Sequence, residues 1–115
     1  MTEFGTRQQE ADELVLPAFG VIEPERVLVV DELFAVAKDR FPVTPGHTLI
    51  IPRRAVLRFA YLNASERARL LEMVVWTQRH LSAISPTPEG YNLGVNDGKA
   101  AGQTIAQFHF HVIPR

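Results

Sequence analysis

The chain has 115 residues, of which 46% are hydrophobic and 22% are charged, and its formal net charge is −1. This length suits one domain with a proper core. The near balance of charge argues against a dominant electrostatic mode of nucleic-acid binding, although a few well-placed groups can still hold one nucleotide. The chain has no cysteine, which rules out disulfides and cysteine-based zinc sites and is compatible with the cytoplasmic location that we expect.

We expect the N-terminal residues to form a lead-in rather than a membrane segment. The longest nearly apolar stretch, 14–22, is broken by a proline and a glycine and is too short to span a bilayer. Residues 1–13 lack the apolar middle of a signal peptide. We therefore predict a peripheral or mobile N-terminal extension over 1–20, followed by one domain over 21–115 that has no membrane partner.

Three short apolar runs predict the first strands of the domain, at 26–30, 33–38 and 48–52. The acidic pair at 31–32 is a turn signal, so the first two runs should form a hairpin. The segment 39–47 contains two prolines and a glycine, which is typical of a loop.

A single long helix is predicted over 63–84. Asn63 can cap this helix, and Glu66 stands at the third helical position, where it completes a capping box. Apolar residues at helical spacing form the stripe that should face the core: Leu70, Leu71, Val74, Val75 and Leu81.

The C-terminal part of the chain returns to strands. Residues 91–96 are predicted as a strand, 97–102 as a glycine-containing loop, and 103–113 as the last strand. One helix thus interrupts a set of strands that are mostly joined by tight turns. This order predicts an α+β fold with a mainly antiparallel sheet of about five strands and one main helix.

The last strand carries an unusual polar pattern. Because side chains alternate along a strand, Gln107, His109 and His111 share one face, with about 7 Å between successive positions. The apolar residues that alternate with them share the other face and can pack against the helix: Phe108, Phe110 and Val112. Burial explains the apolar residues, but it does not explain two imidazoles side by side.

Several interpretations of these imidazoles are open from the residues alone. Imidazole titrates near neutrality and can act as a nucleophile, a general acid or a metal ligand, but two histidines can also simply lie on a surface. No cysteine or nearby acidic residue supports a zinc site. The preceding segment "NDGKAAGQT" (96–104) has glycines and polar side chains that suit an anion, or it is a plain hairpin turn.

Several separated motifs together resemble one known family. They are "PVTPGHTLIIPRR" (42–54), the capped helix, "NDGKAAGQT" (96–104) and "QFHFHVI" (107–113). From about residue 26 to its end, the chain resembles the histidine triad (HIT) superfamily, whose signature alternates three histidines with apolar residues. It looks closest to the branch of fragile-histidine-triad and diadenosine polyphosphate hydrolases. The departure is Gln107, which stands in place of the first triad histidine.

The resemblance implies roles for three histidines. His109 matches the nucleophile of the family. His111 matches the histidine that contacts the phosphate and assists the leaving group, and His47, in the "PGH" turn, matches the one that completes the cluster. The family holds the nucleophile through the main-chain carbonyl of the first triad position, and Gln107 keeps that carbonyl.

The resemblance also implies substrate-binding residues. Asp39 matches a polar residue that holds the ribose hydroxyls, and Asn96, Gln103 and Thr104 match residues along the phosphate path. Gln107 is placed in the same group, because a neutral amide can both donate and accept hydrogen bonds.

The expected function is therefore that of a nucleotide hydrolase or nucleotidyltransferase. It would act on the α-phosphate of dinucleoside polyphosphates or related conjugates, through a nucleotidyl-histidine intermediate. The alternative is a nucleotide-binding HIT protein with little or no turnover. By the same resemblance we expect a homodimer, no required cofactor and no protein-bound metal, although a divalent metal can accompany a polyphosphate substrate.

Overall fold

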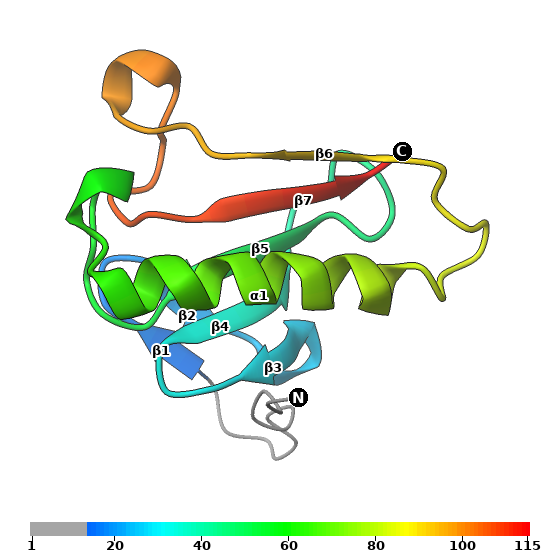
Figure 1. Ribbon diagram of the computed structural model, residues 1–115, viewed down its shortest axis with the longest axis horizontal. Coiled ribbons are helices and arrows are strands. Elements are labelled where there is room, and N and C mark those ends of the chain that lie inside the picture. The colour runs from blue at the N-terminus through cyan, green and yellow to red at the C-terminus, as the bar shows by residue number, and fades with distance from the viewer. Residues whose placement is uncertain (1–13) are drawn as a thin grey trace.

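The computed structural model describes residues 14–115 and places one α-helix across one face of a five-stranded sheet (Figure 1). The strand order is β3-β4-β5-β7-β6, and every neighbouring pair is antiparallel. This confirms the predicted α+β class. The strands of this sheet are β3 (Val27–Val30), β4 (Phe34–Lys38), β5 (Thr48–Pro52), β6 (Tyr91–Gly94) and β7 (Phe110–Pro114). Three short 3-10 helices connect elements in the described residues: Pro24–Arg26, Phe59–Tyr61 and Lys99–Ala101.

Helix α1 (Ala64–Leu81) begins where the capping pattern predicts. The Asn63 side chain accepts a hydrogen bond from the Glu66 backbone N–H at 2.8 Å, and the Glu66 carboxylate accepts one from the Asn63 N–H at 2.8 Å. These bonds satisfy two amides that a helix start leaves without partners. The helix ends at Leu81, three residues earlier than predicted. Within residues 14–115, no helix is long and apolar enough to cross a membrane.

The buried stripe of α1 differs in part from the prediction. Leu71 and Val75 are 69% and 45% exposed, so their assignment to the core was wrong. Each follows a buried residue by one position, which turns its side chain about 100° around the helix. The buried positions repeat instead at helical spacing: Glu66, Leu70, Met73, Val74, Thr77 and Leu81.

The face of the sheet under α1 carries the larger apolar core. Phe34, Ile50 and Val112 from the sheet pack in one cluster with Met73 from the helix. Phe108 belongs to this cluster too, so the prediction that the apolar side of the signature faces the helix is confirmed.

A hairpin covers the opposite face of the sheet. Its strands are β1 (Leu14–Leu16) and β2 (Gly20–Ile22), which pair antiparallel. Leu14, Leu16 and Ile22 are buried in a second cluster against β4 and β5. The sequence does not predict this hairpin, which falls largely within the expected extension over 1–20. The lead-in predicted over 1–13 lies outside the described residues, and the boundary at residue 21 stays a prediction.

The last two strands are shorter than predicted. β7 begins at Phe110 instead of residue 103, and β6 ends at Gly94 instead of residue 96. The ladder between β5 and β7 ends at the pair Ile50 and Phe110. Two residues further along β5 stands Pro52, which has no N–H to donate to a ladder. The histidine pattern therefore starts ahead of the regular strand.

Candidate active site

His109 lies just before β7, where the backbone of Gln107 fixes its ring. Nδ1 of His109 is 2.9 Å from the Gln107 carbonyl oxygen. A carbonyl only accepts hydrogen bonds, so we assign the ring hydrogen to Nδ1. Nε2 then carries the lone pair, which is the form that a nucleophile requires.

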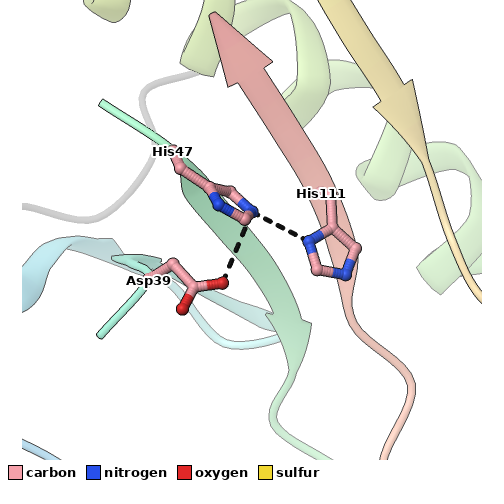
Figure 2. A group of neighbouring side chains, drawn as sticks. All are labelled: Asp39, His47 and His111. Carbon is pink, nitrogen blue, oxygen red and sulfur yellow. Dashed lines mark hydrogen bonds and ion pairs between the residues drawn. The ribbon is translucent and has the colours of Figure 1, made fainter. Parts of the chain in front are cut away.

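His47 and His111 form the second part of the site (Figure 2). His47 directly precedes β5, and the pairing of β5 with β7 brings it beside His111. Nδ1 of His47 accepts a hydrogen bond from the Val43 N–H at 3.1 Å, so the ring hydrogen of His47 lies on Nε2. That atom is 2.9 Å from Nδ1 of His111 and donates to it. His111 consequently carries its own hydrogen on Nε2.

The outer nitrogens of His109 and His111 are open. Their rings contact each other, with centroids 5.1 Å apart. Neither Nε2 has a hydrogen-bond partner among residues 14–115, and in those residues no fully buried side-chain nitrogen or oxygen lacks one. Both Nε2 atoms must therefore reach solvent. One offers a lone pair and the other a hydrogen, on neighbouring rings.

Asp39 lies beside His47, in the pair that His47 forms with His111. Its Oδ2 is 3.4 Å from Nε2 of His47, and its Oδ1 accepts the Phe41 N–H at 2.9 Å. Burial lowers the pKa of His47, and the negative charge of Asp39 opposes that shift. Burial also lowers the pKa of His111 to about 4, and the positive charges that His109 and His47 can carry add to the effect. The imidazoles of His47 and His111 are therefore neutral near pH 7.

Asp39, His47 and His111 also offer ligand atoms that lie within 4.8 Å of one another, a spacing that suits a metal ion. The hydrogen bonds argue against that use. Nδ1 of His47 accepts the Val43 amide, so Nε2 is protonated and has no lone pair for a metal. The group fits a hydrogen-bonded chain better than a metal site.

Of the three residues predicted along the phosphate path, two line one cleft and the third does not. Gln103 and Thr104 line a cleft of about 450 Å³, together with Arg58 and Lys99. The amide of Gln103 accepts the Gly98 N–H and donates to two carbonyls, so it also shapes the loop. The prediction for Asn96 has less support. Asn96 is exposed and is not among the residues that line this cleft.

Gln107 is not placed to touch a substrate with its side chain. The residue is fully buried, and its amide makes all its hydrogen bonds to the backbone of residues 52–56. Its backbone carbonyl, in contrast, contributes to the site through His109. The carbonyl and the side chain of Gln107 therefore have different roles. The sequence analysis predicts a substrate-binding residue here, but the side chain bonds only to backbone.

Phe19 is a neighbour of the site that the sequence did not single out. It sits in the turn of the β1–β2 hairpin, and its ring meets that of His109 edge-on, with centroids 5.8 Å apart. The available signal was "LVLPAFGVI" (14–22), in which two short apolar runs flank a turn-forming segment. The hairpin therefore supplies one wall beside His109.

The fold and these imidazoles define a histidine triad type of protein, and comparisons with known proteins agree. The HIT domain family matches residues 22–115, and the chain belongs to this family. An asymmetrical bis(5'-nucleosyl)-tetraphosphatase from Schizosaccharomyces pombe is 40% identical over 74 residues, which cover 64% of this chain and 40% of that protein. An AP-4-A phosphorylase from Mycobacterium tuberculosis is 36% identical over 99 residues, covering 82% of this chain and 49% of that protein.

A solved structure gives the same picture for the fold. The NitFhit protein of Caenorhabditis elegans superposes with a TM-score of 0.83 at 30% identity, covering 94% of this chain and 26% of that one. The chain thus spans about half or less of these proteins. What they do as whole proteins is a proposal for this chain.

Proposed function

We propose that this chain is a nucleotidyl hydrolase or transferase that acts on the α-phosphate of dinucleoside polyphosphates or related nucleoside phosphate conjugates. Relatives named as a tetraphosphatase and a phosphorylase of such compounds support this substrate class. The observation that carries the proposal is the pair of open Nε2 atoms on neighbouring rings. One has a lone pair on His109, and the other has a hydrogen on His111.

In the first proposed step, the lone pair of His109 Nε2 attacks the α-phosphorus. An N–P bond forms while the bond to the leaving oxygen breaks, which gives a nucleotidyl-histidine. The Nε2–H of His111 stabilises charge on a phosphoryl or leaving oxygen, because it is a donor already fixed in place. His47 holds His111 in the tautomer that makes this possible.

In the second step, water or phosphate attacks the same phosphorus and breaks the N–P bond. The electron pair of that bond returns to Nε2 of His109, and an attacking water releases its proton to solvent. Water gives hydrolysis and phosphate gives phosphorolysis, so the proposed intermediate allows either of the two activities for which the relatives are named. No step requires a metal held by the protein. A divalent cation can enter as part of the polyphosphate substrate.

The test is the substitution His109→Ala, assayed on diadenosine tetraphosphate. Loss of the nucleophile should lower kcat by at least ~1,000-fold. Intact-mass analysis of rapidly quenched wild type should also show a nucleotidyl adduct that the variant lacks. Arg79→Ala is the control, since Arg79 is an exposed residue of α1 that does not line the cavity beside His47 and Asp39. Equal turnover by His109→Ala and wild type would rule out the mechanism.

A second candidate function is nucleotide binding with little turnover. Gln107 favours it, because this residue removes one titratable ring from the signature. Tight binding of AMP, without an adduct and without hydrolysis of any member of a substrate panel, would identify this function.

We also propose a homodimer. Leu71 and Val75 leave exposed apolar surface on α1, and β6 is an edge strand that exposes 46% of Leu93. Edge strands and apolar helix faces are surfaces that a second subunit can cover. Sedimentation of the purified protein at micromolar concentration should give a dimer, and a monomer would count against it. The cytoplasmic location stays a prediction.

A further inference from the structure

The side chain of Gln107 ties the last segment of the chain to the segment that follows β5. Its Oε1 accepts the Val56 N–H at 2.8 Å, and its Nε2 donates to the carbonyls of Pro52 and Arg54 at 2.9 and 2.8 Å. The residue is 0% exposed. The amide therefore makes three hydrogen bonds to backbone groups, of which those to Pro52 and Val56 are buried and the one to Arg54 is partly buried.

These three bonds match an amide and no single form of imidazole. The side-chain amide of glutamine does not titrate, so it supplies two donors and an acceptor whatever the pH. A neutral imidazole supplies one donor and one acceptor, and an imidazolium supplies two donors and no acceptor. At this position a histidine would leave a carbonyl of 52 or 54, or the Val56 N–H, without its partner.

The tied segment is held on its other side as well. The Phe108 N–H donates to the Val56 carbonyl at 2.6 Å, so the signature is bonded to the segment on both sides of the Gln107 carbonyl. The guanidinium of Arg54 binds the buried carboxylate of Glu66 at 3.0 and 2.8 Å. Glu66 in turn caps α1. Gln107 thus connects the start of the helix to the carbonyl that holds His109.

We propose that the Gln107 side chain is a positioning residue, which fixes the backbone carbonyl of position 107 and thereby keeps His109 in the tautomer with a free Nε2. The proposal concerns how the site works, so its activity readouts rest on the proposed function. The first triad position then acts through hydrogen bonds to backbone alone, and it contributes neither charge nor a proton to the reaction.

The first test substitutes Gln107→Glu, which keeps the shape but places a carboxylate against two carbonyl oxygens. We expect kcat on diadenosine tetraphosphate to fall roughly ten- to a hundredfold with little change in KM, because the nucleophile is misplaced. Protonation of the carboxyl restores a donor, so the ratio of variant to wild-type kcat should rise as the pH is lowered from about 8 to about 6. Gln78→Glu makes the same chemical change on α1, at the far face of the sheet, and should leave both parameters unchanged.

The second test substitutes Gln107→His, which covers the case in which the glutamate variant fails to fold. The new ring loses one of the three bonds when neutral and loses the Val56 contact when protonated. We expect a fall in kcat of up to roughly tenfold and a new acidic limb in the pH profile near pH 6–7 that wild type lacks. A Gln107→His variant with the kcat and pH profile of wild type would overturn the proposal.

A spectroscopic readout separates this inference from the proposed function. Long-range proton–nitrogen NMR of ring-labelled histidine reports which nitrogen of His109 carries hydrogen, with the signal assigned by its loss in His109→Ala. Wild type should show hydrogen on Nδ1 only, and Gln107→Glu should show a mixture of tautomers. If wild type turns over no substrate but this shift appears, the proposed function fails and the positioning role stands. A His109 tautomer that is identical in Gln107→Glu and wild type would refute the positioning role.

Discussion

The two faces of the sheet are covered by different elements. Under α1, large apolar side chains such as Phe34, Met73 and Phe108 are almost completely buried. On the opposite face, a hairpin with strands of three residues covers β4 and β5, and the buried set there includes the polar residues His47 and His109. A strand that alternates between these faces can anchor the fold with one set of residues and keep imidazoles available with the other. Substitutions on the helix face should affect mainly stability, and substitutions on the histidine face should affect mainly the site.

The largest expected effect is on stability, from the helix face. Met73 is 0% exposed and lies in the cluster between α1 and the sheet. Met73→Ala should lower the free energy of unfolding by about 2–5 kcal/mol, through lost burial and a cavity. Urea denaturation measures the change. The folded fraction should keep the kcat of wild type at low temperature, and a large loss of kcat there would mean that the faces are not separable.

The next effect is a pH dependence, from the histidine face. The pKa of His111 is about 4 in the folded protein, against about 6.5 when unfolded. Between these two pH values, the unfolded state binds a proton at His111 that the folded state does not bind. The free energy of unfolding should therefore fall as the pH drops from about 6.5 to about 4. We expect a contribution of ~1–3 kcal/mol. Denaturation of His111→Gln should show a smaller loss over this window, whereas equal losses in both proteins would contradict the shift.

A smaller effect is expected where α1 begins. Glu66 is buried, and its hydrogen bonds with Arg54 lower its pKa, against the opposing effect of burial. Glu66→Gln keeps a cap acceptor but removes the charge, so it should cost about 1–2 kcal/mol. Thermal unfolding near neutral pH measures the loss. Glu72→Gln, which changes an exposed carboxylate on the same helix, is the control and should stay close to wild type.

The smallest expected effect concerns the hairpin wall beside His109. Phe19 is half-buried and meets His109 edge-on. Phe19→Ala should change stability by about 1 kcal/mol or less, yet lower kcat/KM by a few-fold, because the ring of His109 loses a neighbour that restricts it. Steady-state kinetics with Val21→Ala as the exposed control on the same hairpin would show the difference. An unchanged kcat/KM would remove Phe19 from the site.

Local patterns predicted much of the fold. β5 was predicted with its observed bounds, because a branched apolar run ends at a proline. The start of α1 followed from Asn63 and Glu66, whose side chains act within one turn. The early end of the ladder at β7 was not predictable in the same way. It depends on Pro52, which is far away in sequence and becomes a neighbour only in the folded sheet.

The candidate site also has features that were predictable and features that depend on distant parts of the chain. The clustering of His47 with His111 was implied by family resemblance, and the register of β5 and β7 provides it. The tautomers depend on backbone partners such as the Val43 N–H, which no side-chain pattern reveals. Gln107 shows the limit most clearly. Its residue type suggested a polar contact in the site, whereas its side chain is buried and bonds to the backbone of residues 52–56.

The hairpin turn has a further consequence for how the molecule responds to warming. Ala18 has a φ of 63°, a left-handed conformation that costs a residue with a β-carbon ~1–2 kcal/mol. Two strands of three residues must offset this cost, so the hairpin is expected to detach at lower temperature than the helix face. Heat inactivation should then precede the loss of helical circular dichroism, and a glycine at position 18 should bring the two transitions closer together.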